Sequence, residues 1–232
     1  MAKTAVITGA GSGLGASLAR KFSLKGYHVC LLGRTKSKLV ETASSLKNNA
    51  SIYEVDVTSS KQVKKVMESI IIEYGCIDCL VNNAGIGIFK NFDLLNEEEI
   101  HQMIDTNLKG TIFCTQHVLT SMKKQNQGFI INIVSASGKR AKETESVYSA
   151  SKFGVRGFFE ALDQELQHTN IKTFSVYMGN MKTDLWRHGG VGDQINNYMN
   201  PDDVADLIMD CIKPRKNLLV QDITIMNRID EY

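Results

Sequence analysis

Tyr148 and Lys152 are the residues of this chain whose types and spacing point most directly to chemistry. If the segment is helical, residues four positions apart lie on one face, on successive turns. An ammonium beside a phenol favours the phenolate, so Lys152 is expected to lower the pKa of Tyr148 from about 10 toward working pH. A tyrosine tuned in this way can give a proton to, or take one from, a carbonyl or alcohol oxygen.

The residues after this pair have the pattern of the helix that should carry it. Apolar side chains recur at nearly helical spacing as far as Asn170, namely Phe153, Val155, Phe158, Phe159, Leu162 and Leu166. The pair alone is weak evidence, because a chain with 7 tyrosines and many lysines can contain it by chance. Other segments of the chain must supply the rest of a site.

A glycine-rich turn near the N-terminus indicates a dinucleotide site. A short strand at 3–8 is followed by Gly9-Ala-Gly-Ser-Gly-Leu-Gly15, a helix to about Lys25 and a strand at 28–32. Glycines at the first turn of such a β-α-β unit let the backbone approach a pyrophosphate, and the helix N-terminus supplies free N–H groups. A P-loop is excluded because no Gly-Lys-Ser/Thr closes the motif. A merely tight turn is the alternative.

The end of the second predicted strand favours NADP(H) over NAD(H). Dinucleotide folds normally carry an acidic residue there, which binds the ribose 2′-hydroxyl. Here the place holds Gly33, followed by Arg34. A carboxylate would repel a 2′-phosphate, whereas a guanidinium can bind it with two hydrogen bonds. A solvated loop arginine is the alternative interpretation.

Strands and helices alternate along the whole chain, which predicts one doubly wound parallel sheet, a Rossmann fold of about seven strands flanked by helices. Further helices are expected at 36–46, 59–74, 96–106, 109–123 and 201–212, and further strands at 51–55, 77–81, 129–134, 171–177 and 218–226. No linker or repeat divides residues 1–232, so we expect a single domain. Gly189, Gly190 and Gly192 suggest a substrate lid near 184–200.

Composition excludes several classes of partner. Hydrophobic residues make up 43% and charged residues 22%, as in ordinary soluble domains, and the formal net charge is +2. We therefore expect no binding to nucleic acid or membrane. Met1-Ala2-Lys3 leads straight into the first strand, without room for a signal peptide, so a cytoplasmic protein is expected.

The cysteines suggest neither a disulfide framework nor a metal site. Cys76 and Cys79 form a C-x-x-C, but a zinc or redox role would need a second ligand pair or a helix N-terminus. Cys79 lies in the apolar run 77–81, where it is interpreted as a small strand residue. No metal is expected.

Four motifs in order make the chain resemble the short-chain dehydrogenase/reductase family from about residue 3 to residue 184. They are the turn Thr8–Gly15, Asn82-Asn-Ala-Gly85, a serine (Ser135) thirteen positions before the tyrosine, and Tyr148-Ser-Ala-Ser-Lys152; Asn107, in Asp105–Gly110, matches a fifth family position. The resemblance implies an oxidoreductase that interconverts a ketone or aldehyde and an alcohol by hydride transfer. Alternatives are an NAD-linked member and a non-catalytic dinucleotide sensor.

The resemblance also implies roles for individual residues. Tyr148 would be the acid/base, Ser135 would bind the substrate oxygen, Lys152 would lower the tyrosine pKa and bind the nicotinamide ribose, and Asn107 would anchor a proton path to Lys152. The cofactor would be bound by Gly9, Ser12, Gly13, Leu14, Gly15, Arg34, Asp56, Val57, Asn83, Ala84, Gly85, Tyr148, Lys152, Gly179, Met181 and Thr183.

Each of these roles has a structural alternative. Ser137 could replace Ser135, although the family's spacing favours Ser135. Asn107 could only cap or kink a helix, and Asp56 could simply begin the turn at Thr58.

The sequence departs from the family after the sixth strand, where Met178-Gly179 replaces the usual Pro-Gly and Met181 replaces a valine. The tail 220–227 also lacks the Asp-Gly-Gly of many tetrameric members, including typical 3-oxoacyl-carrier-protein reductases. A homodimer or homotetramer is still expected, with the helices near 109–123 and 148–168 pairing across a two-fold axis.

Basic loop residues raise the question of an acidic substrate. Lys139, Arg140 and Lys142 follow Ser135, and Arg187 and His188 lie in the expected lid. Together they could hold the carboxylate of a 3-oxo or 3-hydroxy acid. The alternative is that they are solvated charges, partly balanced by Glu143 and Glu145.

Overall fold

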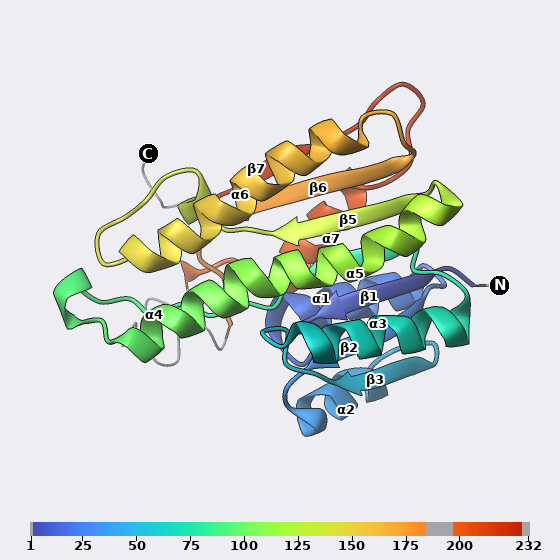
Figure 1. Cartoon of the computed structure of the whole chain (residues 1–232), viewed down its shortest axis with the longest axis horizontal. Helices are drawn as coiled ribbons and strands as arrows, with labels where there is room; N and C mark the ends of the chain where they lie inside the picture. The colour runs from blue at the N-terminus through green and yellow to red at the C-terminus, as the bar shows by residue number, and fades with distance from the viewer. Residues whose placement is uncertain (1, 184–196, 229–232) are drawn as a thin grey trace.

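The computed structural model describes residues 2–183 and 197–228 and contains one seven-stranded parallel sheet. Its strand order is β3-β2-β1-β4-β5-β6-β7 (Figure 1), which confirms the doubly wound fold expected from the sequence. The strands are β1 (Thr4–Thr8), β2 (His28–Gly33), β3 (Ala50–Glu54), β4 (Cys79–Asn82), β5 (Gly128–Ile133), β6 (Ile171–Met178) and β7 (Asp222–Ile225).

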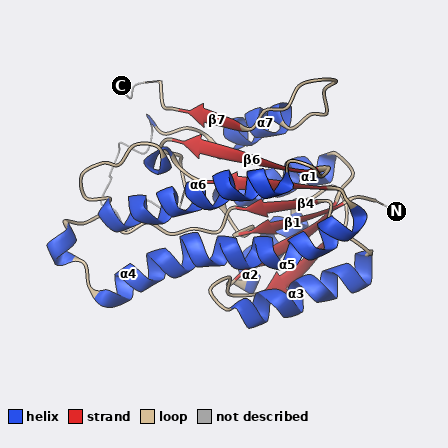
Figure 2. Ribbon diagram, turned by 45° about the horizontal axis from the view of Figure 1, so that its top comes forward, coloured by secondary structure: helices blue, strands red, loops and turns tan. Residues whose placement is uncertain are grey.

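Helices cover both faces of the sheet and bury a separate apolar core on each. On one face lie α3 (Ser60–Tyr74), α5 (Gly110–Gln125) and α6 (Ser146–Leu166), and on the other lie α1 (Gly13–Leu24), α2 (Lys36–Ser44) and α7 (Pro201–Cys211) (Figures 1 and 2). Successive strand residues point to opposite faces. Val6 of β1 therefore packs in the first core, whereas Ala5 and Ile7 pack in the second.

Local capping signals set where several helices begin. The Ser59 side chain accepts a hydrogen bond from the backbone of Gln62 at the start of α3, and α7 has Pro201 in its first turn. At the start of α4 (Glu97–Met103), Asn96 and Glu99 form a reciprocal capping box. These polar residues satisfy backbone N–H groups that have no partner inside the helix.

The structure differs from the sequence prediction between residues 96 and 123. The two helices expected there are joined by a π-helical turn, Ile104–Lys109, so that α4 runs without a break into α5. A π-helical turn inserts an extra residue into a helix, and sequence periodicity does not distinguish it from a short break. It places Asn107 on the buried side of the helix. The last strand is also shorter than expected, because Leu218 and Leu219 are exposed.

The centre of the sheet is a topological switch point. From β1 the chain proceeds outward through β2 and β3 and then returns to β4, which pairs with the other side of β1. The loops after β1 and β4 therefore diverge at the carboxyl ends of their strands, where doubly wound folds bind ligands. Thr8 joins the loops, because its hydroxyl accepts hydrogen bonds from the backbone N–H groups of Asn83 and Ala84 at 2.9 and 3.0 Å.

Candidate active site

A cavity of about 430 Å³ opens at the carboxyl ends of the central strands. It extends from the glycine-rich turn after β1 to the first turn of α6. Most of the residues predicted to bind a cofactor or substrate line it, namely Gly9, Ser12, Gly13, Leu14, Arg34, Asn83, Ala84, Gly85, Ser135, Tyr148, Lys152, Gly179, Met181 and Thr183. The cavity thus brings together residues from the ends of five strands (β1, β2, β4, β5 and β6) and from the α6 helix.

The glycine-rich turn has the backbone shape that a pyrophosphate site needs. Gly9 has a φ of 63°, and a Cβ there would lie 2.9 Å from the Cα of Ala84. A Cβ on Gly15 would lie 2.3 Å from the carbonyl oxygen of Gly9, so only glycine lets α1 approach the strand end this closely. The turn leaves the N-terminus of α1 facing the cavity, with its backbone N–H groups available to an anion. These features fit a dinucleotide.

Ser135 is held in a strained conformation at the end of β5. Its φ of 114° and ψ of 148° lie in a region that is essentially restricted to glycine. Its hydroxyl accepts a hydrogen bond of 3.2 Å from the backbone N–H of Ser137 and also hydrogen-bonds Tyr148. The strain aims the Ser135 side chain at Tyr148 across the cavity.

Tyr148 and Lys152 lie one turn apart on α6, as the sequence predicts, and both are buried. The Lys152 ammonium donates a hydrogen bond of 3.3 Å to the carbonyl oxygen of Ile133 and lies 5.7 Å from the centre of the Tyr148 ring. Phe89 packs edge-on against that ring, with the ring centres 5.3 Å apart. The phenol is therefore fixed between an apolar wall and two polar groups.

The expected lowering of the Tyr148 pKa is not found in the protein alone. Burial raises the pKa of Tyr148 to about 12; the hydrogen bond with Ser135 lowers it, and the charge of Glu145 raises it. Burial also lowers the pKa of Lys152 to about 8. The prediction was wrong because it considered the ammonium and neglected the loss of water around both groups. Near neutral pH the tyrosine holds its proton, as a proton donor must.

Asn107 lies behind the cavity and connects two of its walls. Its side chain accepts a hydrogen bond from the Ile86 backbone N–H at 2.8 Å and donates to the Ile86 carbonyl at 2.9 Å. It also donates to the Ser151 hydroxyl at 3.0 Å. Asn107 thus ties the loop after β4 to the helix of Tyr148 and Lys152.

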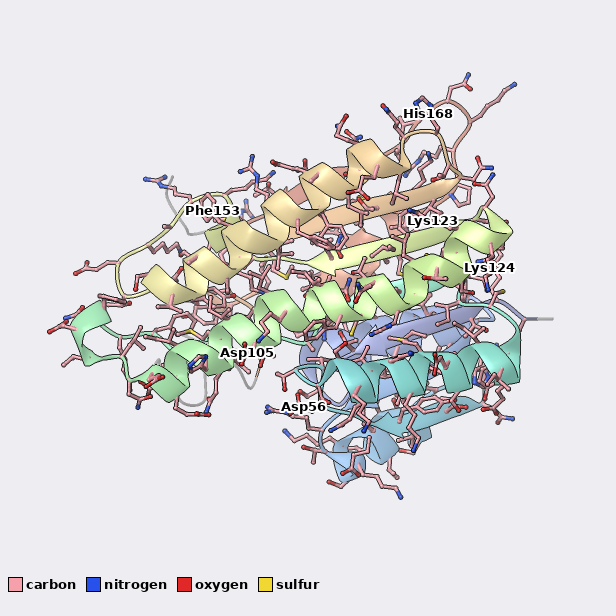
Figure 3. All side chains as sticks on the ribbon, in the orientation of Figure 1. Asp56, Asp105, Lys123, Lys124, Phe153 and His168 are labelled. Atoms are coloured by element: carbon pink, nitrogen blue, oxygen red, sulfur yellow. The ribbon has the colours of Figure 1, made fainter. Side chains whose placement is uncertain are left out.

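Four predicted site residues do not line the cavity. Asn107 lies behind it, and Gly15 faces the Gly9 carbonyl. Asp56 lies beyond the end of β3 (Figure 3), where its carboxylate accepts a hydrogen bond from the backbone of Thr58 at 2.9 Å. The turn-forming alternative accounts for this contact. Val57 is buried beneath Gly110.

Two of the three described basic residues that were expected to converge on the substrate do not line the cavity. Lys139 forms an ion pair of 2.7 Å with Asp222 and lies over the Tyr177 ring, and Arg140 does not line the cavity. Arg187, His188 and the glycines of the expected lid lie outside the described residues. Among the described residues of this group, Lys142 alone is in the cavity wall.

Sequence reasoning missed Glu145 as a site residue. Its carboxylate is in the cavity wall and accepts a hydrogen bond of 2.5 Å from the Ser137 hydroxyl. Its position three residues before Tyr148 is one helical turn away, which is the signal that could have identified it.

Two features are absent from the described part of the chain. No group of three or more His, Cys, Asp or Glu side chains there could hold a metal ion, and no helix there is long and apolar enough to cross a membrane. All five cysteines are free thiols, and Cys79 is a buried residue of β4.

The comparison with protein families identifies the architecture. The family model for short chain dehydrogenases matches residues 3–190. The chain belongs to the short-chain dehydrogenase family. The resemblance of the chain to this family is thereby confirmed, and the protein is an oxidoreductase of that family.

Relatives of this short-chain dehydrogenase match nearly its whole length. An uncharacterized oxidoreductase of Staphylococcus saprophyticus is 34% identical over 227 residues, covering 96% of both chains. The alcohol dehydrogenase of the archaeon Thermococcus sibiricus, solved with 5-hydroxy-NADP, has a TM-score of 0.92 at 25% identity and covers 100% of this chain and 99% of its own. A serine dehydrogenase in complex with NADP⁺ has a TM-score of 0.92 at 28% identity, covering 99% and 96%.

Proposed function

We propose that this short-chain dehydrogenase is an NADP(H)-dependent enzyme that interconverts a ketone or aldehyde and the corresponding alcohol. The observation that carries the proposal is that Ser135, Tyr148 and Lys152 share one cavity with the glycine-rich turn. A nicotinamide cofactor fits this arrangement and, when bound, exchanges a hydride with the carbonyl carbon. The cofactor phosphates would lie at the N-terminus of α1, and Lys152 and Thr183 would contact its nicotinamide end.

Tyr148 supplies the proton in the direction of reduction. Its hydroxyl donates to the substrate oxygen as negative charge develops there, and Ser135 hydrogen-bonds the same oxygen. Lys152, held by the Ile133 carbonyl, places a positive charge beside the phenol and stabilises the tyrosinate that remains. Asn107 hydrogen-bonds both the loop after β4 and α6, which holds the two segments in a fixed relative position. Tyr148 and Lys152 on α6 therefore keep their alignment with the cavity.

Preference for NADP(H) is supported by Arg34. Its side chain is exposed at the cavity rim and has no ion pair or hydrogen bond within the described residues. A free guanidinium at the end of β2 is placed to bind a 2′-phosphate, and no carboxylate occupies the position of Gly33. The T. sibiricus enzyme with 5-hydroxy-NADP and the serine dehydrogenase with NADP⁺ support the same choice.

Action on a 3-oxo or 3-hydroxy acid has weaker support. Lys139 is engaged with Asp222, and the mouth of the cavity holds both Lys142 and the carboxylate of Glu145. A non-catalytic dinucleotide sensor would not need the proton donor, the serine and the lysine that this cavity contains.

A homo-oligomer is proposed from the outer face of α5 and α6. The three phenylalanines of α6 differ in exposure: Phe159 is buried in the core, Phe158 packs against it, and Phe153 is 42% exposed. Figure 3 labels Phe153 on α6. Of these three aromatic side chains, Phe153 is therefore the one that is largely exposed, and α5 and α6 lie side by side on one face of the sheet (Figure 1). A monomeric mass by light scattering at micromolar concentration would contradict the proposal.

The test is a panel of carbonyl compounds and alcohols with NADPH, NADH and their oxidised forms, applied to the wild type and Tyr148→Phe. The variant should bind NADPH as the wild type does, because only one hydroxyl is removed. Its kcat should fall by about 10²–10⁴-fold. Cofactor binding without turnover of any compound by the wild type would favour the sensor instead, and near-normal kcat in the variant would refute the role of Tyr148.

A further inference from the structure

The wall of the cavity next to Tyr148 contains a carboxylate that the proposed reaction does not require. Glu145 immediately precedes α6, three residues before Tyr148, and its side chain lines the same cavity. The charge of Glu145 also raises the pKa of Tyr148, so it works against formation of the tyrosinate. The position of Glu145 therefore calls for another explanation, either a structural role or a role in substrate binding.

The obvious structural role is not used. A side chain at the start of a helix commonly caps it by accepting a hydrogen bond from a backbone N–H. Glu145 makes no such cap, although it occupies the capping position of α6. Instead its Oε2 accepts a hydrogen bond from the Ser137 hydroxyl at 2.5 Å, and Ser137 is buried. Ser137 therefore fixes the carboxylate in the cavity wall.

The carboxylate has an oxygen left for a ligand. Within the described residues, Oε1 of Glu145 has no hydrogen-bond or ion-pair partner, and no ion pair joins Glu145 to its neighbour Lys142. Lys142 is exposed and no described residue holds its ammonium, so that group is free to remain in solvent. A charge held in position recognises a ligand better than one that must first be ordered.

We propose that Glu145 determines substrate specificity by binding an ammonium group, so that the preferred substrates are amino alcohols and the corresponding amino ketones. This inference rests on the proposed oxidoreductase function of the same cavity. The ammonium donates a hydrogen bond to the carboxylate that Ser137 positions, while the carbinol oxygen faces Tyr148 and Ser135. In the oxidation, a bound NADP⁺ would accept the hydride of the carbinol carbon. The hydroxyl proton would pass to the tyrosinate form of Tyr148, which has first released its own proton to solvent.

Binding of a cation beside Glu145 also offsets the increase in the Tyr148 pKa that the Glu145 charge causes. Its positive charge offsets the negative charge of the carboxylate, and the tyrosinate is then easier to form. The substrate itself thus supplies the positive charge that balances the Glu145 carboxylate. A neutral alcohol of the same shape lacks this effect, so the selectivity is expected in turnover as well as in binding.

The test compares alcohols of matched shape that differ in charge, at neutral pH. The pairs are 1-amino-2-propanol with 2-butanol, and 4-amino-2-butanol with 2-pentanol; 3-hydroxybutyrate is the anionic compound. In the wild type, kcat/KM for at least one amino alcohol should exceed that of its neutral partner about tenfold or more. Glu145→Gln should abolish the ratio, and Ser137→Ala should reduce it. Glu143→Gln, an exposed residue of the same loop that does not line the cavity, should keep it.

A second measurement separates this inference from the proposed function. Calorimetric titration of the same alcohols into the protein, alone and with NADPH, needs no turnover. If no alcohol is oxidised, the proposed function is wrong, but binding of an amino alcohol that Glu145→Gln weakens tenfold still upholds the ammonium site. Equal binding of each pair, a ratio unchanged in Glu145→Gln, or preference for 3-hydroxybutyrate would overturn it.

Discussion

Asn107 donates a hydrogen bond of 3.0 Å to the Ser151 hydroxyl, which itself donates one of 2.6 Å to the carbonyl oxygen of Tyr148. Both side chains are buried. The π-helical turn is therefore connected through two hydrogen bonds to the backbone of the residue that is proposed to transfer the proton. Changes in Asn107 should affect both the stability of the fold and the alignment of the site.

Asn107→Ala should lower the free energy of unfolding by about 1–3 kcal/mol or more, because the Ile86 backbone groups and Ser151 lose a buried partner. Urea unfolding measures this loss. Thr111→Val is the matched control: it removes one hydroxyl, which donates to the Asn107 carbonyl at 2.8 Å, and should cost only about 0.5–1.5 kcal/mol. Equal losses in the two variants would show that the Asn107 side chain has no special structural role.

Ser135 should reveal its strain when it is replaced by glycine. Ser135→Gly and Ser135→Ala both remove the hydroxyl, but only glycine is relaxed at a φ of 114°. Such strain costs of the order of 1–3 kcal/mol, and the greater flexibility of glycine in the unfolded chain offsets about 0.5–1 kcal/mol of the gain. We expect the glycine variant to be more stable than the alanine variant by about 1–2 kcal/mol in urea unfolding, and both to lose activity.

If the Ser135→Ala variant were as stable as the Ser135→Gly variant, the backbone of Ser135 would not be strained. Both variants lose the hydrogen bonds of the serine hydroxyl, so the difference in stability between them reports the backbone conformation alone.

Much of the fold follows from local signals in the sequence. The alternation of strands and helices, the glycine-rich turn and the polar residues at the strand ends are all local, and they predict the seven-stranded sheet and most of the cavity wall. The motif spacing likewise places Ser135 opposite Tyr148.

What sequence reasoning missed depends on contacts between distant segments. The π-helical turn contains Asn107, whose side chain contacts Ile86 and Ser151 in distant segments. The ion pair that removes Lys139 from the site involves Asp222, which is 83 positions away. The pKa of Tyr148 depends on burial, which no single motif specifies. These contacts and this pKa depend on tertiary packing, which the local sequence pattern does not predict.

The buried ammonium of Lys152 should make stability depend on pH. Burial lowers its pKa from 10.5 to about 8. Below about pH 8 both folded and unfolded chains hold this proton, and the folded state bears the full cost of the buried charge. Between about pH 8 and 10.5 only the unfolded chain binds the proton, so the contribution of Lys152 to the free energy of unfolding rises with pH. The total rise is of the order of 3 kcal/mol.

Lys152→Met isolates this effect. The difference in the free energy of unfolding, wild type minus variant, should increase between about pH 8 and about pH 10 in urea titrations. Lys124→Met, on the exposed end of α5 (Figure 3), controls for the loss of one positive charge. Tyr148, whose pKa is raised to about 12, acts in the opposite direction only above about pH 10. A difference that is flat with pH would mean that Lys152 is hydrated in solution.

The proposed preference for NADP(H) can be tested at Arg34 without disturbing the fold. Replacing Gly33 by aspartate would be the usual way to favour NAD(H), but a Cβ there would lie 3.2 Å from Leu39, a buried side chain of α2. Arg34→Met alone avoids this tight contact, because Arg34 is exposed at the cavity rim. It removes the guanidinium while keeping an unbranched apolar side chain about as long as the arginine stem.

We expect Arg34→Met to weaken NADPH binding by about 10–150-fold, the value of one charge-assisted contact with a phosphate, and to leave NADH binding nearly unchanged. Cofactor fluorescence titration gives both dissociation constants. Lys36→Met is the control, since it removes the same charge from an exposed position two residues away that does not line the cavity. An equal loss in the control would indicate general electrostatic attraction, and equal affinity of the wild type for NADH and NADPH would rule out a 2′-phosphate site at Arg34.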